Sequence, residues 1–251
     1  MSSASPQKVH RQHSAAGLTI FCGLMLLSIG ALLALGVWQV ERLSWKRDLI
    51  ARVDQRVHAE PSPAPTRTEW SQVNRPNDEY RRVTATGTLL NDRETLVYAS
   101  TALGPGYWVI TPLARADGTS ILINRGFVPT ERRDPVARPD GQISGPVSIT
   151  GLLRLTEPKG TLIKSNDPAN DRWYSRDTAA IAQRRGIADV APYFIDADGT
   201  PNPGGMPTGG LTQIAFANNH LVYAITWFVL AAMAVGLLVI VVRGEMRVRR
   251  A

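Results

Sequence analysis

Two stretches without charge dominate the hydrophobic pattern of the chain. Residues 17–40 and residues 221–242 contain no Asp, Glu, Lys or Arg. Each has the roughly 20 apolar residues that a helix needs to cross a bilayer. The first stretch is too long for the apolar region of a signal peptide, so we interpret it as a retained anchor. The pattern predicts two transmembrane helices.

The region between these stretches has the alternating pattern of β-strands. The predicted strands cover residues 80–90, 94–99, 107–113, 121–128, 147–153 and 193–196. The hairpin within this region is largely apolar on both faces, which is typical of a closed barrel or a sandwich. A short helix is predicted over residues 177–185, and Asp196 and Asp198 are interpreted as turn residues.

The dipeptide Asp-Gly at residues 117–118 is the strongest hairpin signal. A type I′ turn needs a positive φ at both central positions, and this dipeptide is favoured there. A two-residue turn would pair Leu113 with Leu122. Further from the turn it would pair Trp108 with Phe127.

The patterns together predict a membrane protein of the α+β class. Two transmembrane helices are expected to flank an extracytoplasmic antiparallel β-rich domain with a barrel- or sandwich-like sheet. The expected parts are a disordered cytoplasmic tail (residues 1–16), a transmembrane helix (17–40), a juxtamembrane helix to about His58 with a proline-rich linker (41–65), the β-rich domain (66–210), a lead-in with the second transmembrane helix (211–242) and a basic cytoplasmic tail (243–251).

The formal net charge of +7 comes with basic residues at membrane-flanking positions, so nucleic-acid binding is not expected. Lys8 and Arg11 precede the first apolar stretch, and four arginines follow the second. By the positive-inside rule both tails lie in the cytoplasm. We therefore expect a multi-pass membrane protein whose β domain lies outside the cytoplasm. In a cell inner membrane, where we expect the protein, that side is the periplasm, equivalent to the intermembrane-space side of mitochondria.

Residue usage argues against an enzyme. The single cysteine, Cys22, lies in the first apolar stretch and cannot form a disulfide within the chain. The predicted β domain has no histidine, so Ser–His–acid and Cys–His catalytic sets cannot form within it. The sequence contains neither a glycine-rich phosphate-binding motif with its lysine nor a metal-ligand cluster.

His220 stands at the polar end of the second apolar stretch, after two asparagines. On a helix it shares one face with Tyr223, Ala224 and Trp227. An ionisable group at the water–lipid boundary is a candidate functional site. Tyr and Trp are also ordinary interfacial anchors, so a purely anchoring role is the alternative.

Trp38, Arg42 and Trp45 share one helical face where the first stretch ends, and the two-span topology puts them at the depth of His220. A neutral imidazole is a suitable axial ligand for haem iron, so we hypothesise that His220 is that metal ligand. The residues expected around the haem are Trp38, Tyr223 and Trp227 beside the macrocycle and Arg42 or Arg125 at the propionates. Arg125 also fits the more common role of a hydrogen-bonding organiser of a loop.

Several short motifs occur in a fixed order along the chain. They are Leu35-Gly36-x-Trp38-Gln39-x-x-Arg42-x-x-Trp45-Lys46, Gly104-Pro105-Gly106-Tyr107, Thr111-Pro112-Leu113, Asn124-Arg125-Gly126-Phe127-Val128-Pro129, Trp173-Tyr174, Pro192-Tyr193-Phe194 and residues 218–228. With these motifs the chain resembles the surfeit-locus-one (Shy-type) family of cytochrome c oxidase assembly proteins over nearly its whole length after residue 30. Each motif is weak alone, but their order between two spans makes them jointly specific. Phe127 departs from the family, which often carries Trp there, and keeps the aromatic character.

The resemblance implies an assembly factor for the haem-copper (cytochrome c) oxidase of the respiratory chain. It implies that haem a is bound near the outer membrane face, with the family's second-span histidine at His220. It also implies aid in inserting haem a into the catalytic subunit of cytochrome c oxidase. The expected partners are that subunit, haem A synthase and the lipid bilayer.

Three other functions are considered. A cofactor-free membrane scaffold would stabilise an oxidase subunit during assembly. A sensory receptor is disfavoured because the nine residues after Val242 leave no room for an output domain. A haem-modifying enzyme should need several histidines in the membrane, where only His220 is available.

Overall fold

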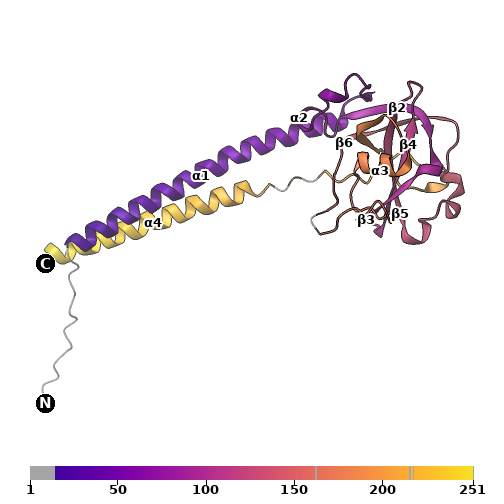
Figure 1. Ribbon diagram of the computed structural model, residues 1–251. Coiled ribbons are helices and arrows are strands. Elements are labelled where there is room, and N and C mark those ends of the chain that lie inside the picture. The colour runs from indigo at the N-terminus through magenta and orange to yellow at the C-terminus, as the bar shows by residue number, and fades with distance from the viewer. Residues whose placement is uncertain (1–14, 162, 215, 217, 251) are drawn as a thin grey trace, which may run out of the picture. The chain divides into compact units, whose positions relative to one another are not determined.

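The computed structural model describes residues 15–161, 163–214, 216 and 218–250 (Figure 1). Residues 1–14, which make up most of the predicted disordered tail, lie outside the described residues. The chain divides into a helical unit, Met1–Ile50 with Phe216–Ala251, and a β unit, Ala51–Ala215.

Two long helices correspond to the two uncharged stretches. α1 covers Ala15–His58 and ends where the apolar pattern predicts, and α4 covers His220–Arg250. Both are long and apolar enough to cross a membrane. Large apolar side chains on them are exposed, among them Leu27 and Ile240. Such exposure is typical of a helix surrounded by lipid, because the core helix of a soluble protein buries these side chains.

α1 and α4 bury a narrow stripe of residues. Within the helical unit the buried positions are Ile29, Gly36, Gln39 and Leu43 on α1 and Ala224 and Ala231 on α4. Their spacing of three, four and seven residues is typical of helices that pack against each other. A Cβ atom at Gly36 would lie 2.6 Å from Cε1 of Phe228. The glycine therefore leaves the room that the aromatic ring occupies.

In the described part of the β unit, seven strands form a single sheet. Their bounds are β1 Ser62–Pro63, β2 Arg82–Leu89, β3 Thr95–Thr101, β4 Gly104–Ala114, β5 Ser120–Pro129, β6 Pro146–Leu155 and β7 Val190–Ala197. The order is β1-β2-β6-β7-β5-β4-β3, and β2 also pairs with β4. The β2–β4 pairing closes β2, β6, β7, β5 and β4 into a ring. The prediction of a β-rich domain between two apolar helices is confirmed, and its sheet is barrel-like.

One pairing in the ring is parallel, namely β5 with β7, and the other four are antiparallel. Parallel neighbours need a long connection, and here it contains β6 and the short helix α3 at Thr178–Arg185. Asp177 caps this helix by accepting a hydrogen bond from the N–H of Ala180. A second short helix, α2, covers Arg75–Asp78. β1 lies within the predicted proline-rich linker and pairs with β2.

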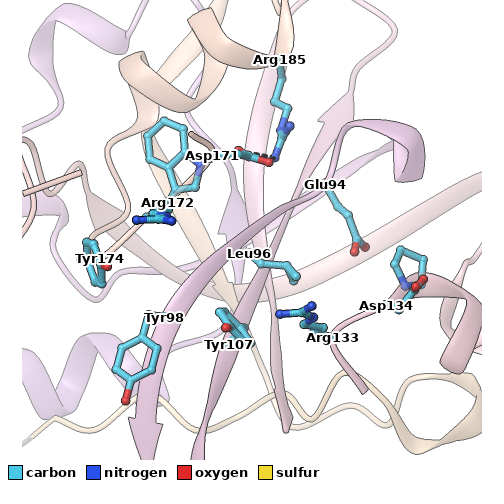
Figure 2. A pocket seen from close by; sticks show the side chains of 12 residues that line it. Glu94, Leu96, Tyr98, Tyr107, Arg133, Asp134, Asp171, Arg172, Tyr174 and Arg185 are labelled. Carbon is cyan, nitrogen blue, oxygen red and sulfur yellow. Dashed lines mark hydrogen bonds and ion pairs between the residues drawn. The ribbon is translucent and has the colours of Figure 1, made fainter. Parts of the chain in front are cut away.

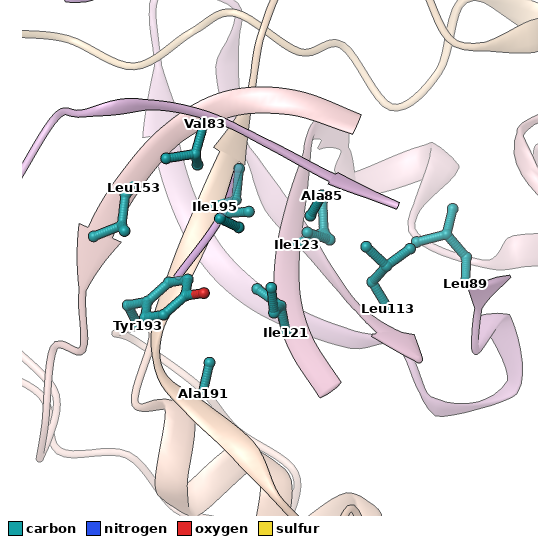
Figure 3. Packing of buried hydrophobic residues seen from close by; sticks show 11 residues of the cluster. Val83, Ala85, Leu89, Leu113, Ile121, Ile123, Leu153, Ala191, Tyr193 and Ile195 are labelled. Carbon is teal, nitrogen blue, oxygen red and sulfur yellow. The ribbon is translucent and has the colours of Figure 1, made fainter. Parts of the chain in front are cut away.

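The hydrophobic core fills the interior of the ring (Figure 3). Val83, Ile121 and Ile195 come from three different strands and are fully buried. Inward and outward residues alternate along each strand, because successive side chains point to opposite faces. The hydroxyl of buried Tyr193 donates a 2.7 Å hydrogen bond to the carbonyl oxygen of Pro65, so its polar end is satisfied within the core.

Asp196 is buried at the centre of a polar network, so its interpretation as a turn residue is wrong. Its carboxylate accepts hydrogen bonds from Asn124 (2.7 Å), Arg154 (3.0 Å), Arg176 (3.1 Å) and Thr212 (3.0 Å). Burial is the largest influence and lowers the pKa of both arginines. Attraction to Asp196, together with Glu79 beside Arg154 and Glu157 beside Arg176, outweighs it, so each pKa is raised. The network joins β5, β6, β7 and the segment after β7.

The hairpin turn differs from the predicted type I′ turn. The N–H of Arg115 donates to the carbonyl of Thr119 (2.9 Å), and the N–H of Gly118 donates to the carbonyl of Arg115 (3.1 Å). These bonds enclose a three-residue loop, in which Gly118 has φ of 80°. The carboxylate of Asp117 accepts hydrogen bonds from the N–H and the hydroxyl of Thr119. This local bonding favours a type I turn followed by a glycine bulge.

The longer loop shifts the register of the β4–β5 hairpin. Leu113 lies opposite Ile121, so the predicted pairing of Leu113 is wrong by one residue. Trp108 lies opposite Phe127, as predicted. The strands are in the predicted register again at Trp108, because β5 has an extra residue between these two pairs. Gly126 stands there with φ of 131°, which is typical of a β-bulge.

Candidate functional site

The first residue of α4, His220, contacts a buried amide on α1. Its Nδ1 atom lies 2.7 Å from Oε1 of Gln39, whose side chain belongs to a residue that is only 9% exposed. An amide oxygen accepts hydrogen bonds and cannot donate them. Nδ1 of His220 therefore carries the proton and donates it to Gln39. In the neutral imidazole the other ring nitrogen, Nε2, then carries the lone pair.

With Nδ1 as the donor, a neutral His220 has the tautomer that is common among metal-ligating histidines. Histidines that ligate metals almost always donate their second ring N–H to an oxygen acceptor, which sets the tautomer and the ring orientation. A neutral imidazole with a free Nε2 lone pair is a common iron ligand. The pair of His220 and Gln39 thus fits one axial position of a haem iron.

The residues predicted to share one helical face with His220 lie on two different sides of α4. Ala224 is buried, and Trp227 is half-buried with an indole N–H that has no hydrogen-bond partner in the described part of the chain. Tyr223 is 53% exposed. Trp227 therefore lies on the inner side of α4 with His220, whereas Tyr223 lies on the outer side.

The aromatic residues at the corresponding level of α1 are exposed. Trp38 precedes buried Gln39 but is itself 50% exposed, because adjacent residues on a helix point in different directions. The guanidinium of Arg42 lies 4.5 Å from the ring centroid of Trp45. These three side chains form an outward aromatic and cationic surface, and Gln39 is the residue of this segment that meets His220.

Arg125 belongs to the β unit, whereas the other five candidates belong to the helical unit. Its Nη2 atom donates hydrogen bonds to the carbonyl of Gly141 (2.5 Å) and to Oδ1 of Asn202 (3.1 Å). Burial lowers the pKa of Arg125 to about 10, and the carboxylate of Glu94 offsets part of this effect. The side chain is therefore still cationic at neutral pH, and its bonds are those of a loop organiser.

Gln39 is the site residue that the sequence reasoning missed. The signal was present, because it is an amide inside the uncharged stretch of residues 17–40. A polar side chain at that depth needs a partner, and the other apolar stretch begins beside a histidine. Their hydrogen bond joins residues 181 positions apart.

Comparison with known proteins gives consistent matches along most of the chain. The sequence model of the SURF1 family matches residues 26–232. Surfeit locus protein 1 of Rattus norvegicus is 38% identical over 214 residues, which cover 79% of this chain and 68% of the rat protein. Surfeit locus protein 1 of Homo sapiens is 36% identical over 226 residues, or 83% of this chain and 73% of the human protein. The Xenopus tropicalis protein of that name is 36% identical over 85% of this chain.

Proposed function

The chain belongs to the SURF1 family, and on this premise we propose that it is an assembly factor for a haem-copper (cytochrome c) oxidase that carries haem a to the catalytic subunit. The observation that carries the proposal is the 2.7 Å hydrogen bond from His220 to Gln39. It leaves one imidazole nitrogen free at the start of an apolar helix.

One protein ligand is enough for this cofactor. Haem a supplies four nitrogen ligands to its own iron, so the chain needs to provide only an axial group. Among the described residues there is no group of three or more His, Cys, Asp and Glu side chains that could hold a bare metal ion. A single imidazole therefore suits a metal that arrives already bound in a macrocycle.

The residues around His220 have separate roles in the proposal. Gln39 holds the imidazole ring and its proton, so that Nε2 is available without a change of tautomer. Trp227 offers an aromatic face and a half-buried indole N–H on the same side of α4. Trp38 and Tyr223 offer exposed aromatic faces, and Arg42 offers a cation for a propionate.

A carrier must also release its cargo. His220 is half-buried and lies at the first residue of α4, so it stays accessible from one side. One axial bond at an accessible position favours transient binding, since no second protein ligand has to be broken. In the proposal haem a comes from haem A synthase and passes to the oxidase catalytic subunit within the cell inner membrane. Both apolar helices then span the bilayer, and the β unit faces the periplasm.

The test is an absorption spectrum of the full-length protein purified from membranes that synthesise haem A. It is compared with the His220→Ala variant and with His58→Ala, which removes an exposed histidine near the end of α1. We expect a haem band in the parent and in His58→Ala and its loss or shift in His220→Ala. No band in the parent would overturn the carrier and favour a cofactor-free scaffold. An unchanged band in His220→Ala would place haem elsewhere.

A further inference from the structure

A cleft of about 670 Å³ lies in the β unit (Figure 2). Leu96 and Tyr98 of β3 and Tyr107 of β4 form one side of it. The other lining residues come from the loops at 133–135 and 171–174, with Glu94 before β3 and Arg185 at the end of α3. Its size is ordinary for a ligand-binding cleft.

The acidic residues of the cleft already have partners within the chain. Asp171 forms two 2.8 Å hydrogen bonds with Arg185. Asp134 accepts a hydrogen bond from the N–H of Val136. One oxygen of Glu94 forms an ion pair with Arg138. Asp171 and Glu94 are therefore neutralised by arginines, whereas Asp134 keeps its charge, because its hydrogen bond comes from a neutral N–H group. With Arg133 and Arg172, the lining keeps one net positive charge.

Two arginines of the cleft are free to bind a ligand. The guanidinium groups of Arg133 and Arg172 make no hydrogen bond or ion pair with any residue that the structure describes. Figure 2 shows them on opposite sides of Leu96 and Tyr107. Guanidinium groups bind carboxylates in a bidentate geometry. The cleft thus presents two separate positions for anionic groups.

Glu94 requires a hydrogen-bond donor on the ligand, whereas the arginines require anionic groups. Its side chain is only 8% exposed, and its Oε2 atom is buried without a hydrogen-bond partner among the described residues. A buried carboxylate oxygen needs a donor, and an N–H group of a ligand can provide one. A ligand for this cleft should therefore carry both carboxylates and N–H donors.

Aromatic side chains complete the surface. Tyr98 is 46% exposed, and its ring centroid lies 6.2 Å from that of Tyr107 and 6.3 Å from that of Tyr174. Nζ of Lys164 lies 5.1 Å from the centroid of Tyr174. Tyrosine and arginine are enriched among the residues that contribute most to protein–protein binding.

We propose that this cleft is a docking site for an acidic peptide segment of a partner protein. Carboxylates of the segment pair with Arg133 and Arg172, and a backbone N–H donates to Oε2 of Glu94. A free phosphate fits less well, because two separate guanidinium groups match two carboxylates of one chain, and inorganic phosphate has no N–H group to donate to Oε2 of Glu94. The site uses residues of the β unit alone and does not depend on haem binding.

The test measures binding of a fluorescein-labelled peptide, acetyl-Gly-Asp-Ser-Glu-Gly, to the full-length protein in detergent by fluorescence anisotropy. We expect the acidic peptide to bind at least about tenfold more tightly than its Asn/Gln counterpart, since charge-assisted hydrogen bonds are stronger than neutral ones. Arg133→Gln and Arg172→Gln should each weaken binding by a similar factor. Arg75→Gln, which changes an exposed arginine of α2 outside the cleft, should bind like the parent.

Several outcomes would overturn the docking site. These are absence of binding, equal binding of both peptides, an equal loss in Arg75→Gln, or tighter binding of ATP than of the peptide. The His220→Ala variant separates this proposal from the haem proposal. It should bind the acidic peptide like the parent, and a loss of peptide binding in this variant would also contradict the site.

Discussion

The Nδ1 atom of His220 and the Oε1 atom of Gln39 lie 2.7 Å apart, and they belong to the two different apolar helices. The bond therefore does two things at once. It joins α4 to α1 at the first residue of α4, and it sets which ring nitrogen of the histidine is free. Because a buried amide left without its partner is costly, each residue also stabilises the position of the other.

Replacing Gln39 with leucine tests this relationship. Gln39→Leu removes the acceptor, and loss of such an orienting group typically lowers metal affinity about 10–100-fold. Gln39→Glu should retain binding, because a carboxylate accepts the same proton. Haem titration followed by absorbance measures the affinity. Val37→Leu, at an exposed position of the same turn, is the control. Equal affinity in Gln39→Leu and the parent would show that Gln39 does not position the ligand.

Gly36 is the second test of the helix pair. Gly36→Ala would bring a Cβ to 2.6 Å from the ring of Phe228, and overpacking of this kind costs about 1–3 kcal/mol. Gly30→Ala is the matched control, since a Cβ there meets nothing within 4 Å. Thermal unfolding in detergent measures the stability of both variants. Adding Phe228→Leu should restore part of the loss, and a Gly36→Ala protein as stable as Gly30→Ala would contradict the contact.

The two arginine candidates for the propionates can be separated. Arg125→Gln removes charged hydrogen bonds to Gly141 and Asn202, so we expect a loss of about 1.5–3 kcal/mol in the stability of the β unit. Haem affinity should stay unchanged. Arg42→Gln should weaken haem binding and leave the stability unchanged, because Arg42 is exposed. Denaturant unfolding and haem titration of both variants decide between them. Weaker haem binding in Arg125→Gln at unchanged stability would support the ligand role of Arg125.

Asp196 offers a test of the buried network. Asp196→Asn leaves the half-buried Arg154 and Arg176 without their shared carboxylate. Breaking a buried ion pair costs about 3–5 kcal/mol, which is the upper value expected here because both guanidinium groups keep some contact with water. Asp198→Asn is the control, because among the described residues the Asp198 side chain accepts only an exposed hydrogen bond from the N–H of Thr200. Denaturant unfolding should show a much lower midpoint for the first variant. Similar midpoints would mean that the network contributes little.

Lowering the pH should reduce the stability of the β unit, because Glu157 becomes protonated. Burial raises the pKa of this carboxyl, but the hydrogen bonds and charge of Arg176 outweigh it, so the pKa is lowered in the folded state. A group with a lowered folded pKa stabilises the fold above its unfolded pKa, and this contribution is lost as the pH falls through the folded value. Stability should therefore fall below about pH 4.

Glu157→Gln provides the comparison for this pH dependence. Its free energy of unfolding should change less between pH 7 and acid pH than that of the parent. Glu131→Gln, at an exposed position, should follow the parent. Identical pH profiles for the parent and Glu157→Gln would show that the ion pair with Arg176 does not contribute.

Local signals explain why much of the β unit was predictable. Strand alternation and the short helix predicted over residues 177–185 depend on near neighbours in the chain, and both agree with the structure, where the helix covers Thr178–Arg185. The hairpin register was off by one residue near the turn. Hydrogen bonds that Thr119 donates to the carboxylate of Asp117 favour a longer loop there, and the dipeptide signal does not include them. The bulge at Gly126 then restored the predicted Trp108–Phe127 pair.

The sequence by itself determined the two apolar helices, the β-rich region between them and the histidine at the start of α4. Length, hydrophobicity and periodicity are properties of short segments, so they can be read without a fold. Only the tertiary structure decided that the sheet closes through β2 and β4, that Asp196 is buried among arginines and that Gln39 meets His220. Each of these depends on contacts between residues far apart in the chain, and no local pattern specifies such contacts.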